Sequence, residues 1–172
     1  MNNNDRLLRL RYAIDIKDTD LIKAFELGGI TITRDELRDI LTKMGPSSRD
    51  EENTYLKPID NQELDAFLNG FIILKRGPQK DKPAEAAQPK SDEIKYINNV
   101  LLKKLKIALF LTSDDMLAIL AEAEVFPSKG EMGAILRKEG HRNFKPCGDN
   151  YARNFLKGLG LVYRKEENSQ KQ

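Results

Sequence analysis

Residues 3–14 read NNDRLLRLRYAI, and residues 98–109 read NNVLLKKLKIAL. The second segment repeats the first after a shift of 95 positions, with two asparagines, two leucines and an alanine in common. In both segments the apolar residues recur at helical spacing, which predicts an amphipathic helix. A helix that occurs twice in this way indicates that the chain contains a duplicated unit.

The match between the two copies continues beyond this helix. The shift of 95 also aligns Glu36 with Glu131 and Ile40-Leu41 with Ile135-Leu136. A shift of 88 aligns the ends of the copies, with Lys57-Pro58 over Lys145-Pro146, Phe67-Leu68 over Phe155-Leu156, and Gly70 over Gly158. The smaller shift means that copy one carries seven additional residues, in a polar stretch broken by Gly and Pro that we expect to be a surface loop.

Each copy contains four stretches with helical periodicity, and strand signals are scarce. The sequence therefore predicts an all-α fold, a tandem duplication of a roughly 70-residue four-helix module with about eight helices. The predicted divisions are the first repeat (1–77), a flexible Pro/Lys/Ala linker (78–93), the second repeat (94–165) and a polar tail (166–172).

Several polar residues and glycines are predicted to mark the ends and contacts of these helices. Thr33 and Glu36 have the spacing of a capping box, in which each side chain binds a free backbone N–H of the other residue. The other predicted N-caps are Asp18, Asp60, Ser113 and Ser128, and Asp149 is predicted to open the last helix. The paired asparagines at 3–4 and 98–99 are interpreted as cap or turn residues, and Gly70 and Gly158 as sites of close helix packing.

Composition excludes several classes of protein. Of the 172 residues 40% are hydrophobic and 33% are charged, and no apolar run is long enough for a membrane span. The N-terminus lacks the pattern of a signal peptide, and the single cysteine cannot form an internal disulfide, so we expect a cytoplasmic protein. The charge is uneven: residues 1–77 carry a net −2 and residues 98–172 a net +4.

The residues of the two copies resemble the YehS-like family, small bacterial proteins built from two copies of a domain of unknown function. The resemblance runs from Asn3 to about Tyr163 and is most specific at residues 4–12, 67–77, 98–108 and 141–159. It implies a helical tandem fold but brings no activity, ligand or catalytic residue. Copy one departs from the family pattern in its longer loop after Lys43 and in Ile59, where a cysteine is expected.

The nearest approach to a reactive site is the set His141, Cys147 and Asp149, since a Cys–His pair could form a thiolate nucleophile. The repeat supplies a test, because Cys147 aligns with Ile59. A position that accepts either residue is most simply a buried apolar site. One histidine and one cysteine also make an ordinary zinc site implausible. We therefore predict no catalytic residue, metal site or cofactor.

Basic faces on the first helix of each repeat are the candidate binding residues: Arg6, Arg9, Arg11, Lys103, Lys104 and Lys106. Such faces could contact a phosphate backbone or an acidic protein, whereas most charge runs are simply solvated. The leading functional hypothesis is a non-enzymatic protein-interaction or adaptor module that binds a protein partner or a second copy of itself. The alternatives are nucleic-acid or ribosome-associated binding through the basic faces and, third, a cysteine-dependent enzyme.

Overall fold

The computed structural model describes residues 1–44, 52–77 and 94–170. Within these ranges the chain forms eight helices and one isolated antiparallel bridge. The helices are α1 (Asn3–Ile14), α2 (Asp18–Leu27), α3 (Arg34–Leu41), α4 (Asn61–Arg76), α5 (Ile97–Ala108), α6 (Ser113–Glu122), α7 (Lys129–Leu136) and α8 (Asp149–Gln170). Four belong to each copy, which confirms the all-α tandem fold. The predicted linker and most of the additional loop of copy one lie outside the described residues.

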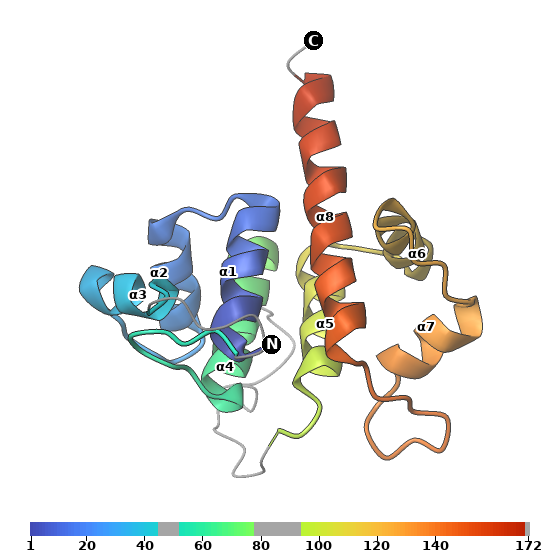
Figure 1. Ribbon diagram of the computed structural model, residues 1–172, viewed down its shortest axis with the longest axis horizontal. Coiled ribbons are helices and arrows are strands. Elements are labelled where there is room, and N and C mark those ends of the chain that lie inside the picture. Colours follow the sequence, from blue (N-terminus) through green and yellow to red (C-terminus); the bar gives the residue numbers. More distant parts are fainter. Residues whose placement is uncertain (45–51, 78–93, 171–172) are drawn as a thin grey trace.

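Helices α1, α4, α5 and α8 form the centre of the molecule and all run in the same direction, upward in Figure 1. Helix α1 packs mainly against α8, and α4 packs mainly against α5. The first helix of each repeat therefore packs against the last helix of the other repeat, while contacts between α1 and α4 or between α5 and α8 are few. The repeats are interlocked, and exchanging α1 with α5 and α4 with α8 preserves the arrangement.

The second helix of each repeat packs closely on the last helix of the same repeat, α2 on α4 and α6 on α8. A glycine lies at each contact. A Cβ atom on Gly70 would lie 1.6 Å from the carbonyl oxygen of Ala24, and one on Gly158 would lie 1.9 Å from that of Ile119. Both distances are too short for any side chain, which confirms the predicted role of the two glycines.

The buried apolar side chains of both repeats form one continuous cluster. In repeat one the ring of Phe67 lies 5.0 Å from that of Phe25 and 5.9 Å from that of Phe71. The counterpart of Phe67 in repeat two, Phe155, is also completely buried. Because burial of apolar surface is the main favourable term in folding, the two repeats are stabilised by a core that they share.

Helix starts that depend on local hydrogen bonds agree with prediction. Thr33 and Glu36 form the predicted capping box of α3. Asp60 caps α4 and forms a second capping box with Glu63. Ser128 accepts a hydrogen bond from the backbone N–H three residues later and caps α7.

Two predicted N-caps, Asp18 and Ser113, are wrong by one residue, and the last helix is longer than expected. Helix α2 begins at Asp18 itself, and its N-cap makes no side-chain hydrogen bond. Helix α6 begins at Ser113, because Thr112 forms the capping box instead. Helix α8 continues to Gln170, so most of the predicted polar tail (166–172) is helical.

Candidate functional site

The buried polar side chains of the described chain lie on the first helix of each repeat. They are Asn3, Asn4, Asp5, Arg6, Asn98 and Asn99. Polar groups removed from water need hydrogen-bond partners, so their contacts show what α1 and α5 hold in place.

Asn4 connects α1 to two other segments of repeat one. Its amide donates to the carbonyl oxygens of Ile40 (2.8 Å) and Lys57 (2.9 Å), and its oxygen accepts from the N–H of Ile59 (3.0 Å). Asn99 makes the same three bonds in repeat two, with Ile135 (3.0 Å), Lys145 (2.9 Å) and Cys147 (2.8 Å). The interpretation of the paired asparagines as helix caps is therefore wrong, because they lie within helices and fix the tertiary structure.

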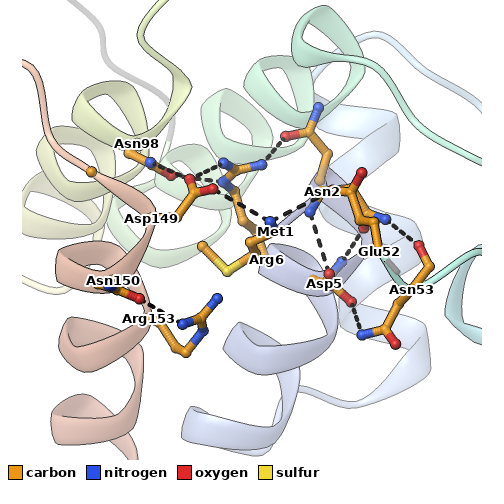
Figure 2. A network of polar contacts seen from close by, with 12 residues as sticks. Met1, Asn2, Asp5, Arg6, Glu52, Asn53, Asn98, Asp149, Asn150 and Arg153 are labelled. Atoms are coloured by element: carbon orange, nitrogen blue, oxygen red, sulfur yellow. Dashed lines mark hydrogen bonds and ion pairs between the residues drawn. The ribbon is translucent and has the colours of Figure 1, made fainter. Parts of the chain in front are cut away.

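Arg6 lies between the two repeats and is only 6% exposed. Its guanidinium donates to Oδ1 of Asn3 (2.9 Å), Asn98 (2.7 Å) and Asp149 (3.0 Å), and Figure 2 shows Arg6 beside Asn98 and Asp149. The Asn98 amide also donates to Asp149 (2.9 Å), and the amino terminus of Met1 lies 3.3 Å from the other oxygen of this carboxylate. One arginine thus joins α1, α5 and the start of α8.

The ionisation of Asp149 is favoured by these partners. The hydrogen bond from Asn98 has the largest effect and, with the positive charges of the amino terminus and Arg6, outweighs burial, so the pKa of Asp149 lies below its ordinary value. The carboxylate in turn balances a buried guanidinium, which would otherwise be very costly.

Asp5 forms a second cluster at the start of α1. Its carboxylate accepts from the Tyr55 hydroxyl (2.5 Å), the Asn53 amide (3.0 Å) and the N–H of Asn2 (3.3 Å). Burial by itself would raise the pKa of Asp5, but these bonds outweigh it, and the pKa lies below its ordinary value. Burial and the bond to Asp5 raise the pKa of Tyr55. The cluster holds the segment before α4 against α1.

Half of the cations predicted to form exposed basic faces are neutralised in the structure. Arg6 is buried, so its placement on a surface face is wrong. The guanidinium of Arg11 binds Asp18 at 2.8 Å, and the Lys104 ammonium binds the carboxylate of Asp65. Of these three residues, Arg6 and Lys104 join the two repeats, and Arg11 joins α1 to the start of α2.

The other three predicted cations are Arg9, Lys103 and Lys106. Arg9 is exposed, and the two lysines are partly exposed. The Lys103 ammonium donates to a backbone carbonyl at 3.3 Å, and none of the three forms an ion pair among the described residues. Their role in binding stays a prediction.

Cys147 does not have the surroundings of a nucleophile. Its thiol is buried and donates to the carbonyl oxygen of Gly148 at 3.6 Å. Burial, together with the charge of Asp149, raises the pKa of the thiol to about 12, whereas a reactive cysteine needs a lowered pKa. In the described ranges no hydrogen bond joins Cys147 to His141, which is exposed. Ile59, the counterpart of Cys147, is buried too, which confirms the interpretation of an apolar position.

An exposed apolar patch lies where α5 ends. We define the Phe110 patch as Arg76, Ile107 and Phe110. Phe110 is 64% exposed and Ile107 is 46% exposed. The Arg76 guanidinium lies 4.5 Å from the centre of the Phe110 ring and donates to the Ile107 carbonyl at 3.1 Å. The patch therefore combines apolar surface with one fixed positive charge.

The backbone at Phe110 is unusual for an aromatic residue. Phe110 has a φ of 57°, in the left-handed region that bulky residues rarely adopt. The equivalent residue of repeat one is Asp15, with a φ of 49°. Aspartate tolerates this conformation because its short polar side chain can bind locally. Repeat two thus holds a large apolar side chain outward where repeat one has a residue better suited to the turn.

Within the described ranges, no group of three or more His, Cys, Asp or Glu side chains is arranged to hold a metal ion. None of the helices there combines the length and hydrophobicity needed to cross a bilayer.

A family model described as protein of unknown function (DUF1456) matches residues 3–77 and 98–165, one match for each interlocked repeat. The chain belongs to this family. It is also 40% identical over 159 residues to the uncharacterized protein YehS of Escherichia coli strain K12, an alignment that covers 92% of this chain and 94% of that protein. No solved structure matches. The resemblance to the YehS-like family is confirmed, and neither DUF1456 nor YehS carries a description of a specific function.

Proposed function

We propose that this member of the DUF1456 family is a non-enzymatic protein-interaction module and that its partner docks on the Phe110 patch. The observation that carries the proposal is the exposed Phe110 at a positive φ. An aromatic side chain in the left-handed region costs about 1–2 kcal/mol, and with 64% of Phe110 exposed only a small burial energy offsets this cost in the isolated chain. Burial by a partner would supply that missing energy.

The chemistry of the patch indicates the kind of partner. A docked apolar side chain would cover Ile107 and the edge of Phe110, while Arg76 beside them would pair with a carboxylate. Aromatic and arginine side chains are the residue types that most often dominate binding energy at protein interfaces. The patch thus fits a protein segment with apolar and acidic residues, on a different protein or on a second copy of this chain.

The surroundings of Cys147 and Asp149, the residues nearest to a reactive site, support the non-enzymatic part of the proposal. The Cys147 thiol has a raised pKa and Asp149 is bound by Arg6 and Asn98. A buried cysteine that stays reduced is also consistent with a cytoplasmic protein.

The test is the substitution Phe110→Asp, which introduces the residue that repeat one carries at the equivalent position. We expect the variant to fold with equal or greater stability, because aspartate suits the backbone. We also expect it to lose at least a tenfold factor in affinity for the partner recovered with the wild-type chain. Affinity capture from native cells, quantified by mass spectrometry, identifies that partner, and sedimentation velocity detects self-association.

Phe126→Ser is the matched control, because Phe126 is 78% exposed and lies outside the Phe110 patch. The control should retain the partner that Phe110→Asp loses. The proposal would be wrong if wild type and Phe110→Asp captured the same proteins in the same amounts and showed the same association state.

A further inference from the structure

The interlocked repeats create two equivalent helix contacts, which we call the α4–α5 seam and the α1–α8 seam. The shifts of 88 and 95 residues pair Asp65 with Arg153, Asn69 with Lys157 and Arg76 with Arg164, and they pair Lys104 with Arg9 and Ile107 with Tyr12. The two seams can therefore be compared position by position, because they have the same backbone arrangement but different side chains.

The α4–α5 seam is electrically balanced. The Lys104 ammonium of α5 binds the carboxylate of Asp65 and the amide oxygen of Asn69 (2.6 Å), both on α4. The Lys104 and Asp65 side chains are only 24% and 23% exposed. A cation and an anion therefore neutralise each other across this seam.

The α1–α8 seam carries cations at all three equivalent positions: Arg9, Arg153 and Lys157. None of them forms an ion pair among the described residues, although the guanidinium of Arg153 donates to Asn150 at 2.8 Å. Figure 2 shows the Arg153 side chain extending from α8 towards α1. Lys157 and Arg9 are exposed. Where the α4–α5 seam has a salt bridge, the aligned positions of the α1–α8 seam hold only cations.

The carboxylates beside this seam already have partners. Asp5, one turn before Arg9, accepts the hydroxyl of Tyr55 and two further bonds, so the charge of Arg9 contributes only the last of the effects on its pKa. Asp149, one turn before Arg153, is bound by Arg6 and by the amino terminus. The sequence then contains no acidic residue from Asn150 to Lys165. Within the part of the chain that the structure describes, no acid pairs with Arg9, Arg153 or Lys157 as Asp65 pairs with Lys104 in the other seam.

The cations of α8 form a row. Arg153, Lys157 and Arg164 share one helix face with Gly160, where a Cβ atom would lie 3.3 Å from Cα of Ala13 in α1. The face that contacts α1 is therefore bordered by positive charges. At 1.5 Å per residue the row from Arg153 to Arg164 is about 16 Å long, which suits a chain of anionic groups better than a single anion.

An exposed aromatic ring lies at the end of this row. Tyr12 is 74% exposed, and the Arg164 guanidinium lies 4.7 Å from the centre of its ring. An exposed ring beside a row of cations is the arrangement with which proteins bind single-stranded nucleic acids, with bases stacked on the ring and phosphates along the cations.

We propose that the α1–α8 seam binds a single-stranded nucleic acid, with Arg9, Arg153, Lys157 and Arg164 at successive phosphates and Tyr12 against a base. The inference goes beyond the proposed protein docking and uses a separate surface, so either proposal can fail alone. It retains Arg9 from the predicted basic faces and moves the remaining contacts to α8.

The test is fluorescence anisotropy with a short labelled single-stranded RNA at low and at physiological salt. Four phosphate contacts predict that log K falls with log salt at a slope of about −3. The test variant is Arg153→Asp with Lys157→Asn, which gives α8 the residues that α4 carries. We expect its affinity for the RNA to fall at least tenfold and its salt slope to become shallower by about 1.4. Its thermal stability should be unchanged or higher, because Arg9 gains a carboxylate.

The charge-matched control is Arg34→Asp with Lys23→Asn, two exposed residues of repeat one that form no ion pair in the described structure. This control should lose at most a small factor in affinity. Equal losses in the seam and control variants, or no binding by the wild type at low salt, would overturn the proposal. Binding of polyglutamate that depends on the seam as strongly as RNA binding does would also overturn it, because the seam would then accept any polyanion.

Discussion

At the scale of single residues, the repeat provides an internal comparison for every buried polar group. Asn4 and Asn99 make the same three backbone hydrogen bonds, so their role depends on the fold and belongs to both repeats. Arg6 has no such counterpart, since the equivalent residue is the fully buried Leu101. Its positive charge is balanced because Asp149 stands where repeat one has Asn61. The pair is a point at which the two repeats have diverged together.

The substitution Asp149→Asn should destabilise the protein at neutral pH. It leaves Arg6 as a buried charge without its counterion, and because the Asp149 side chain is 46% exposed we expect a loss of about 2 kcal/mol rather than a larger one. The folded-state pKa of Asp149 lies below its ordinary value of 3.8, so this stabilisation is present above about pH 4. It is lost as the pH falls through the folded-state pKa, where the carboxylate takes up a proton.

Urea denaturation at several pH values measures this effect. The difference in the free energy of unfolding between wild type and Asp149→Asn should shrink as the solution is acidified. The double variant Arg6→Leu with Asp149→Asn, which copies the pair Leu101 and Asn61, should recover part of the lost stability. A difference that is absent at pH 7, or that does not change with pH, would show that the pair contributes nothing.

At the scale of helices, features that depend on neighbouring residues were predictable from the sequence, whereas contacts between distant residues were not. Thr33 and Asp60 begin helices as predicted, because a cap depends on residues only three positions away. The sequence predicts a surface position for Arg6, because Arg9 and Arg11 nearby suggest a charged face. The alignment of Arg6 with Leu101 was the signal that it is buried. That α1 packs on α8 could not be predicted from local pattern, because it depends on residues far apart in the chain.

The packing of α6 on α8 gives a prediction at this scale. In Gly158→Ala the new methyl group meets the backbone carbonyl of Ile119, which cannot rotate away as a flexible side chain could. The helices must separate, and we expect a loss of about 2–3 kcal/mol in the free energy of unfolding, at the upper end of the usual range for overpacking. Gly133→Ala in α7 is the matched control, because its added methyl group meets nothing within 4 Å. It should be neutral or stabilising by up to about 1 kcal/mol, through helix propensity. Thermal and urea denaturation of both variants check the pair, and equal effects would contradict the close contact.

At the scale of the whole molecule, the interlocked packing explains how a duplicated chain can have two seams with different charged side chains. Each seam joins a helix of one repeat to a helix of the other, so a change in one repeat alters one side of each seam. The Lys104–Asp65 salt bridge and the cations Arg9 and Arg153 are the outcomes of that divergence in a common frame. Asp15 and Phe110, which follow the first helix of each repeat at equivalent positions, have diverged in the same way. An unduplicated module would have only one such seam, which could not carry both the salt bridge and the unpaired cations.

Interlocking also predicts that the two repeats fold only together. Separate fragments 1–77 and 94–172 would each expose the apolar faces with which α1 meets α8 and α4 meets α5. We expect each fragment alone to be largely unfolded or aggregated, with far-UV circular dichroism well below that of half the intact chain. Mixed after co-expression, they should form a folded 1:1 complex, less stable than the linked chain because the linker no longer raises the effective concentration of the partner. Size-exclusion chromatography with native mass spectrometry measures the stoichiometry.

Charge decides which complex forms. In a homodimer of the second fragment, Lys104 would face Arg153 instead of Asp65, and like charges at this distance repel. In a homodimer of the first fragment, the exposed Arg9 would meet Asp65, but Arg6 would be buried opposite Asn61 and lose the carboxylate of Asp149. The loss outweighs the gain, because an unpaired buried charge costs far more than an exposed ion pair contributes. Each homodimer thus loses a charge pair that the mixed complex keeps, so the 1:1 complex should dominate even when one fragment is in excess. Two stably folded fragments that remain monomeric on mixing would refute the shared core, and a preference for homodimers would refute the charge argument alone.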